Sequence, residues 1–173
     1  LVAYDRAIAL QPDNALSWAR KGRAYRLMER YEDALLVVDR ALELNPRYGF
    51  AWRGKGLALE RLGRLEEALV AYQHAVDIKP NEVWNWHNKA DVIQKLGRYT
   101  EAIPILNHAL ELDPQHHNSW GKLGQVYRLI GNYVDAVQAY EKAIDLEPEY
   151  AWAHNGRGLA LKAMRLYPEA LIS

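Results

Sequence analysis

The sequence predicts an all-α solenoid, a fold in which antiparallel two-helix units stack along the chain. Two observations predict it. Half of the 173 residues are apolar and a quarter are charged, which is typical of a folded protein. Several residue types also recur at a constant spacing of 34 residues, and such self-similarity indicates a repeat architecture. The recurring prolines and tryptophans are Pro12, Pro46, Pro80, Pro114 and Pro148, and Trp18, Trp52, Trp86 and Trp120.

Residues 15–48 illustrate how each repeat divides into two helices. Trp18, Gly22 and Tyr25 are spaced so that they share one face of a first helix. A short polar turn follows, and the next proline ends the second helix because it lacks a backbone N–H. The second helix is predicted by an apolar stripe, whose members are Tyr31, Ala34, Leu35, Val38, Ala41 and Leu42.

The period divides the chain into a single array of repeats. A second helix alone comes first, four complete units follow, and a first helix with the start of a second helix ends the chain. Because neither end carries a polar capping helix, we expect the chain to be a piece of a longer protein, or its ends to be covered by a partner. The segments are 1–14, then 15–48, 49–82, 83–116 and 117–150, then 151–173.

These residues resemble the tetratricopeptide repeat (TPR) family, whose 34-residue period and order of Trp, Gly, Tyr, Ala, aromatic, Ala and Pro the chain shares. The resemblance covers the whole chain and implies a right-handed superhelical solenoid whose first helices line a concave groove. Two departures stand out: His154 replaces a fifth Trp, and basic residues such as Lys55 often replace the Leu that follows the Trp. The unit 117–150 carries the pattern most fully, in Trp120, Leu123, Gly124, Tyr127, Ala136, Tyr140, Ala143 and Pro148.

The face of the first helices opposite the Trp stripe is unusually basic. The chain has 22 basic and 22 acidic residues, yet on this face only Glu60 and Asp91 are acidic. A surface of one sign attracts ligands of the other, which favours an acidic peptide, although long basic side chains can also serve solubility alone. The basic residues are Arg20, Arg23, Arg26, Arg53, Arg61, Lys95, Lys122, Arg128 and Lys162.

The same face carries Phe50, Trp84 and Trp152, which either form pockets for anchor side chains or pack between neighbouring helices. Its glycines, Gly121 among them, either allow close helix contact or leave room for a ligand backbone. The predicted peptide-binding residues are Arg20, Arg23, Arg26, Phe50, Arg53, Trp84, His87, Asn88, Lys122, Gln125, Arg128, Trp152 and Asn155.

One form of peptide recognition comes from the resemblance alone. TPR domains that bind chaperone tails clamp a terminal carboxylate with Lys, Arg and Asn side chains on successive first helices. Arg53, Asn88 and Lys122 are compatible with that clamp, whereas Leu57 and Asn118 are not. A C-terminal carboxylate is therefore a second version of the acidic ligand.

Catalytic chemistry finds no support in the sequence. The absence of cysteine excludes disulfides, thiol catalysis and cysteine metal sites. His87 and Asp91 are too few ligands for a metal, and the glycine-rich stretches match no phosphate-binding motif. We expect no enzyme activity, no metal and no cofactor. No apolar run reaches the roughly 18 residues of a membrane span, and the compartment stays open, with the cytoplasm favoured.

The sequence therefore predicts a non-catalytic protein-interaction module that binds an acidic or C-terminal peptide in a basic, aromatic-dotted groove. One alternative is self-association through the uncapped ends, which gives a homo-oligomer. Another is that the repeats space other domains of a larger protein. Binding of RNA along the basic face is disfavoured by the zero net charge and by the lack of a base-reading code.

Overall fold

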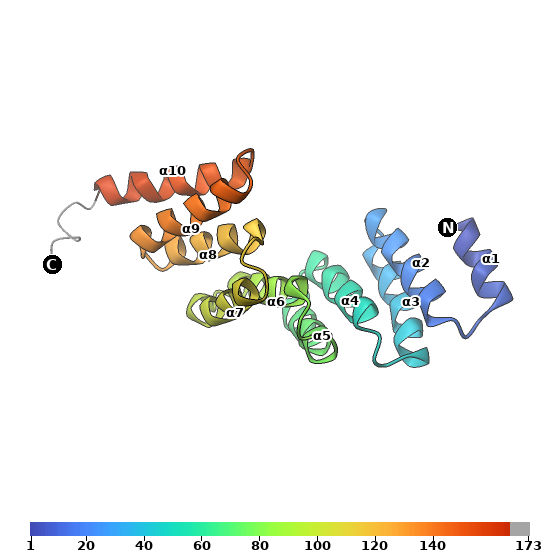
Figure 1. The fold of residues 1–173 in the computed structure, drawn as a ribbon. Helices are drawn as coiled ribbons and strands as arrows, with labels where there is room; N and C mark the ends of the chain where they lie inside the picture. Colours follow the sequence, from blue (N-terminus) through green and yellow to red (C-terminus); the bar gives the residue numbers. More distant parts are fainter. Residues whose placement is uncertain (167–173) are drawn as a thin grey trace. The chain divides into compact units, whose positions relative to one another are not determined.

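The structure, a computed structural model, describes residues 1–166, which form ten α-helices and no strand (Figure 1). This confirms the predicted all-α repeat fold. The second helix expected to begin within 151–173, with Pro168, lies outside the described residues. The helices are α1 Val2–Leu10, α2 Ala15–Leu27, α3 Tyr31–Leu44, α4 Gly49–Arg61, α5 Leu65–Ile78, α6 Val83–Lys95, α7 Tyr99–Leu112, α8 His117–Leu129, α9 Tyr133–Leu146 and α10 Ala151–Leu166.

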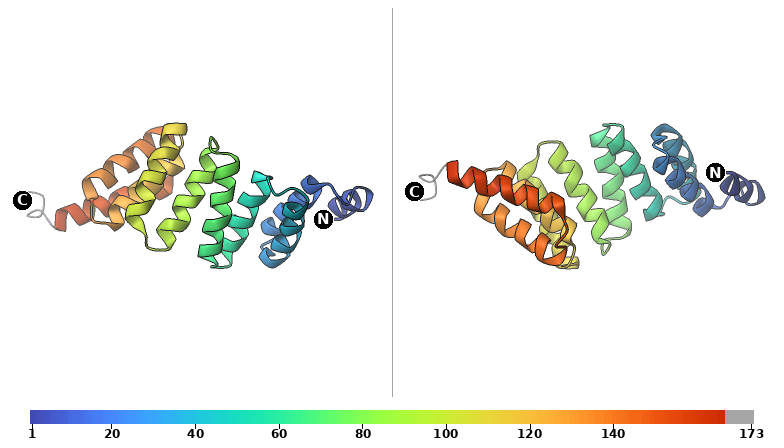
Figure 2. Two further views of the ribbon diagram at one scale, coloured as in Figure 1. Left: turned by 90° about the horizontal axis from the view of Figure 1, so that it is seen from below. Right: turned by 90° about the horizontal axis from the view of Figure 1, so that it is seen from above.

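The helices belong to two compact units, which we call unit 1 (residues 1–85) and unit 2 (residues 86–173). The boundary lies in the first turn of α6. In unit 1, α2 packs on α3, α3 on α4, and α4 on α5. In unit 2, α7 packs on α8, α8 on α9, and α9 on α10. Consecutive helices within each unit run antiparallel, as two further views show (Figure 2).

Every second helix ends two residues before a proline. At the end of α3, the Asn45 N–H donates to the Ala41 carbonyl at 2.9 Å, and the backbone of Asn45 is then extended at φ −143°. Pro46 disfavours helical geometry at the residue before it and has no N–H to continue the ladder. The same arrangement ends α1, α5, α7 and α9.

Three of the recurring tryptophans join a first helix to the turn before it. The Trp18 indole Nε1–H donates to the Pro12 carbonyl at 2.7 Å. Trp52 and Trp120 make the same bond to Pro46 and Pro114, at 2.8 and 2.9 Å. The departure at His154 keeps this function, because the His154 Nε2 lies 2.8 Å from the Pro148 carbonyl. An imidazole N–H can therefore replace the indole N–H.

Small residues let the two helices of one repeat approach closely. A Cβ on Gly56 would lie 2.6 Å from the buried Tyr72 ring, and one on Gly124 would lie 2.9 Å from the Tyr140 ring. Real Cβ atoms do not approach so closely, so a larger residue here forces the helices apart. In unit 2, the Tyr140 ring belongs to a core with Ala136, Ala143, Ala153 and Ala160.

The turns between the two helices of one repeat need a left-handed backbone. Gly63, Gly97 and Gly131 have φ between 75° and 82°, a region that glycine enters without steric cost. The first complete repeat, residues 15–48, has Glu29 at this position, with φ 58°. Glu29 is therefore a strained residue at a site where the other units use glycine.

Candidate peptide-binding surfaces

The predicted binding residues divide between the two units. Each unit has its own hydrophobic core. Those in unit 1 are Arg20, Arg23, Arg26, Phe50, Arg53 and Trp84, and those in unit 2 are His87, Asn88, Lys122, Gln125, Arg128, Trp152 and Asn155.

In unit 1, the structure places Arg23 and Arg61 within electrostatic reach of Arg26. Burial lowers the pKa of Arg26, and the like charges of Arg23 and Arg61 lower it further. In the described part of the chain, none of the three forms an ion pair within 4.0 Å. The acidic residue of this face, Glu60, accepts a hydrogen bond from the Tyr72 hydroxyl at 2.9 Å. We call Arg23, Arg26 and Arg61 the arginine cluster.

The other predicted residues of unit 1 are more constrained. The Arg53 guanidinium lies 3.7 Å from the carboxylate of Glu82. Glu82 precedes α6, so a count of helical positions omits it. Phe50 packs against the core around Ala19 and Ala51, so it serves the helix seam. Trp84 is 42% exposed.

In unit 2, the structure brings four predicted residues to one cavity of about 290 Å³. They are His87, Lys122, Gln125 and Trp152, contributed by α6, α8 and α10. The cavity is also lined by Asp91, Asn118 and Tyr150, which the predicted set lacks. Asn88, Arg128 and Asn155 do not line it. Arg128 instead lies close to the Tyr140 hydroxyl, where its positive charge acts to lower the tyrosine pKa that burial raises.

Lys122 is paired within this cavity. Its ammonium forms an ion pair with Asp91, donates to the Gln125 side chain at 3.0 Å and lies 5.3 Å from the centre of the Trp152 ring. Lys95 also approaches Asp91, at 2.8 Å. Burial acts to raise the pKa of Asp91, but the two lysines outweigh it and hold that pKa below its usual range. Lys122 therefore contributes a neutralised, polar wall.

A buried polar network forms the floor of the same cavity. The Ser119 hydroxyl lies 3.1 Å from Nδ1 of His87 and 2.8 Å from Nδ1 of His116. It can donate to one ring and accept from the other. Burial, with a contribution from His116, lowers the pKa of His87 to about 3. His87 is therefore a neutral hydrogen-bonding group at physiological pH.

The cavity wall formed by Trp152 depends on a glycine below it. A Cβ on Gly121 would lie 2.7 Å from the Trp152 ring and 3.1 Å from the Tyr150 ring. Gly121 thus allows close helix contact. The Tyr150 hydroxyl also donates to Asn118 at 3.2 Å. Trp152 is 37% exposed, so it both packs on α8 and presents one edge to the cavity.

Residues 1–166 contain no group of three or more His, Cys, Asp or Glu that could hold a metal ion. Among the same residues, no helix combines the length and the apolar character needed to cross a bilayer.

Known structures share this architecture. A TPR protein with an unusual peptide-binding site, YrrB, is 21% identical, and the match covers 98% of this chain and 94% of YrrB with a TM-score of 0.76. A MamA protein is 21% identical over 93% of this chain and 88% of its own, with a TM-score of 0.79. MamA 41-end from Desulfovibrio magneticus RS-1 is 20% identical over 90% and 93%, with a TM-score of 0.74. At these identities the likeness shows the fold alone.

Sequence comparison shows the family. None of the curated proteins matches the chain in sequence. Three family models, each described as a tetratricopeptide repeat, match it along its length. One matches residues 21–83 and 131–172, a second matches 82–149, and a third matches 3–35. The chain therefore belongs to the tetratricopeptide repeat family.

Proposed function

We propose that this protein is a non-catalytic interaction module that binds an acidic peptide segment of a partner protein. TPR proteins bind protein or peptide partners, and one structural neighbour is described as having a peptide-binding site. The observation that carries the proposal is the arginine cluster. Its three guanidinium groups have no acidic partner within the described residues, and guanidinium groups present forked donors that match carboxylates.

The two units contribute different contacts in this proposal. In unit 1, the arginine cluster supplies the positive charge. In unit 2, the cavity at Lys122 offers amide, hydroxyl and imidazole groups that can bind peptide backbone or polar side chains. A peptide ending in a free carboxylate is the second version of the ligand, for which Arg53 is the predicted contact in unit 1 and Asn88 and Lys122 are the predicted contacts in unit 2.

The test is the affinity of a fluorescent peptide of alternating glutamate and glycine, measured by anisotropy. We expect Arg23→Glu with Arg26→Glu to weaken binding by more than ~10-fold, since two attractive contacts become repulsive. The matched control is Arg6→Glu with Arg47→Glu, which changes the net charge equally at other exposed sites of unit 1. Equal losses in the two variants, or no binding by the native chain, would contradict the proposal.

Amidation of the peptide separates the two versions of the ligand. If an internal acidic segment is the ligand, the amidated and free peptides bind alike. If a terminal carboxylate is the ligand, amidation weakens binding, and Lys122→Met then weakens the free peptide more than the amidated one.

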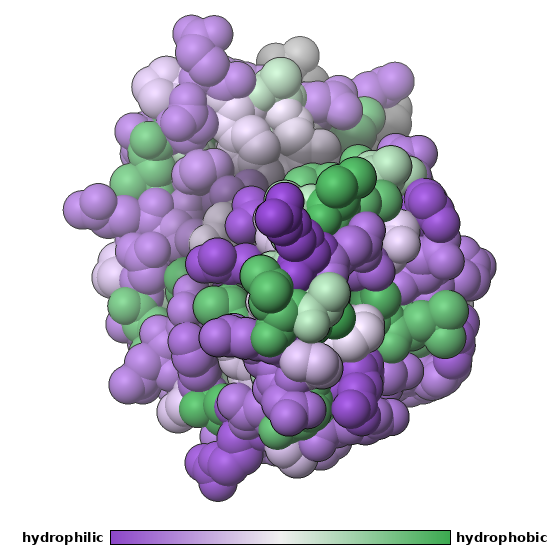
Figure 3. Space-filling view, turned by 90° about the vertical axis from the view of Figure 1, so that its right-hand side faces the viewer, coloured by the Kyte–Doolittle hydropathy of each residue, from purple (hydrophilic) through white to green (hydrophobic). Residues whose placement is uncertain are grey.

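Self-association through the ends is a second candidate, favoured by one observation. On α1, Val2 is 82% exposed and Leu10 is 76% exposed. The space-filling view of this side shows apolar side chains set among polar ones (Figure 3). A sedimentation coefficient that rises with concentration, and no longer does so after Val2→Glu with Leu10→Glu, would support it.

A further inference from the structure

At several repeats, a basic side chain of the protein lies in the seam, by which we mean the contact between a second helix and the first helix that follows it. Each such cation lies on a first helix and pairs with an acid on the second helix before it. The pairs are Lys21 with Asp5 at 2.7 Å, Lys55 with Asp39 at 2.7 Å, and Arg157 with Glu141 at 3.1 Å. Three basic residues that replace the family's Leu, namely Lys21, Lys55 and Arg157, are thus the cationic halves of these ion pairs.

The same lysines cover the recurring tryptophans. Their ammonium groups lie 5.9 Å from the Trp18 ring centre for Lys21, 5.6 Å from Trp52 for Lys55 and 5.5 Å from Trp86 for Lys89. A cation at this distance over an indole face is attracted by the ring quadrupole. Each of these tryptophans therefore already binds a cation supplied by the chain itself.

Trp120 is the exception. The position of the lysine is taken by Leu123, and the position of its acidic partner is taken by Asn107. His74 and His108, which contact the Trp52 and Trp86 rings at centroid distances of 4.2 and 4.5 Å, correspond to Lys142 here. Within residues 1–166, no cation and no other ring is placed over Trp120.

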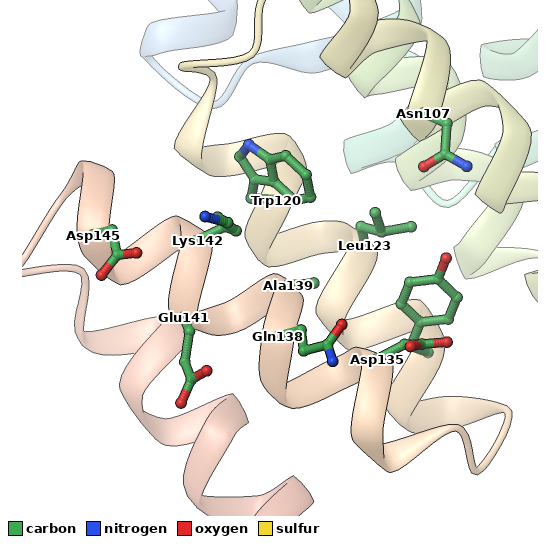
Figure 4. A pocket seen from close by; sticks show the side chains of 10 residues that line it. Asn107, Trp120, Leu123, Asp135, Gln138, Ala139, Glu141, Lys142 and Asp145 are labelled. Atoms are coloured by element: carbon green, nitrogen blue, oxygen red, sulfur yellow. The ribbon is translucent and has the colours of Figure 1, made fainter.

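An open cavity of about 450 Å³ lies at this exceptional seam (Figure 4). Trp120, Leu123 and Tyr127 of α8 form its apolar wall, and Asn107 of α7 flanks it. The equivalent seam in unit 1 has a cavity of about 350 Å³ whose lining includes both Lys55 and Asp39. The unit 1 cavity therefore holds the Lys55–Asp39 ion pair, whereas the unit 2 cavity has Leu123 and Asn107 in its place and carries its own cation, Lys142, at the position of His74.

The lining of the unit 2 cavity carries more acidic than basic groups. Asp135, Glu141 and Asp145 line it, with Lys142 as the base among them. Glu141 is engaged by Arg157, and Asp135 accepts a hydrogen bond from Asn132 at 2.6 Å. Asp145 has no ion pair within the described residues. An incoming cation would thus find an aromatic face and a free carboxylate together.

We propose that this cavity binds the side chain of a lysine or arginine from a partner polypeptide. The basic side chain takes the place that Lys21, Lys55 and Lys89 occupy at the other tryptophans, with its stem against Leu123 and Tyr127 and its cation over Trp120. Asp145 and Asp135 neutralise its charge. This surface is separate from the arginine cluster and selects ligands of the opposite sign.

The test follows the indole N–H resonance of Trp120 by NMR, identified with a Trp120→Phe variant. The probe is an acetylated and amidated pentapeptide with one central lysine among glycines. We expect a saturable shift of this resonance, and binding weaker by about 3-fold or more when norleucine replaces the lysine, since norleucine keeps the stem without the cation. No shift, or equal binding of the norleucine peptide, would overturn the proposal.

A variant that supplies the missing internal cation sharpens the test. Leu123→Lys with Asn107→Asp rebuilds the ion pair of the other repeats, so the lysine peptide should no longer shift Trp120, whereas the matched Leu123→Met variant should still bind. Persistent binding by the rebuilt chain would overturn the proposal. Circular dichroism reports whether that variant folds. If it does not, Asp145→Asn at the exposed rim decides, because it should weaken the lysine peptide and leave the norleucine peptide unchanged.

Discussion

The two units use one repeat to build surfaces of opposite character. In unit 1, the seam between α3 and α4 is filled by the Lys55–Asp39 pair, while the arginine cluster has no acidic partner within the described residues. In unit 2, the seam between α7 and α8 is open, while Lys122 is neutralised by Asp91. The units therefore differ in where they leave charge unsatisfied, and we expect unsatisfied charge to mark the binding surfaces.

The comparison separates two kinds of position within the repeat. Packing positions, such as Gly56 and Gly124, contact a tyrosine at the equivalent position of each unit. Polar positions, such as Asp39 and Asn107, change from one copy to the next although the backbone around them is the same. The packing positions specify the fold, and the polar positions give each unit its own chemistry.

The largest expected difference between the units is their response to acid. Burial lowers the pKa of His87 to about 3 in the folded chain, whereas the ordinary pKa of a histidine is 6.5. Between these two pH values, the unfolded chain binds a proton at this residue and the folded unit 2 does not. Stability is therefore lost as the pH falls from 6.5 towards 3, by about 3 kcal/mol at pH 4. Hydrogen exchange measured at several pH values should show this loss in unit 2. His87→Asn should reduce it and leave the smaller part due to His116, whose pKa burial also lowers.

The packing positions should respond alike in the two units. Gly56→Val and Gly124→Val each force a side chain against a buried tyrosine ring, and we expect each to lower the free energy of unfolding by about 2 kcal/mol. Gly54→Ala is the matched control, because nothing lies within 4 Å of a Cβ at that glycine. Urea unfolding measures all three. A harmless Gly124→Val would show that the helices of unit 2 are less tightly packed than the structure indicates.

The sequence could predict the features that follow the period. The prolines end the second helices as expected, and the tryptophans occupy the packed side of the first helices. Tyr150 and Glu82 precede their helices, so a count of helical positions could not place them at the cavity or beside Arg53. The pairing of Lys122 with Asp91 joins residues of different helices, which one helix's periodicity cannot report. The indole bond to the proline carbonyl, which His154 preserves, also requires coordinates.

Backbone strain at the turn between its two helices distinguishes the first complete repeat from the later ones. Glu29 adopts φ 58°, whereas the later units place glycine there. We expect Glu29→Gly to raise the free energy of unfolding by about 1 kcal/mol, since glycine enters this region without steric cost. Gly97→Ala, at the equivalent turn of a later unit, should lower it by a similar amount. Thermal unfolding of the two variants compares them directly, and a destabilised Glu29→Gly would mean that the glutamate side chain has a stabilising role.

The smallest expected effect concerns the filled seam. Lys55→Met removes the Asp39 ion pair and the cation over Trp52 while keeping the packed stem, so we expect a loss of about 0.5 kcal/mol. Leu123→Met at the open seam is the matched control. If Lys55→Met costs several times more, the internal cation is needed for the fold, and the open seam in unit 2 must be stabilised in another way.

The central claim is that an acidic peptide binds at the arginine cluster of unit 1. Backbone amide shifts of the ¹⁵N-labelled chain, recorded during titration with the glutamate–glycine peptide, test it most directly. The account predicts that the largest shifts lie on α2 and α4 around Arg23, Arg26 and Arg61, and that they weaken as salt is added. Shifts confined to α3 and α5, or unchanged by salt, would contradict it.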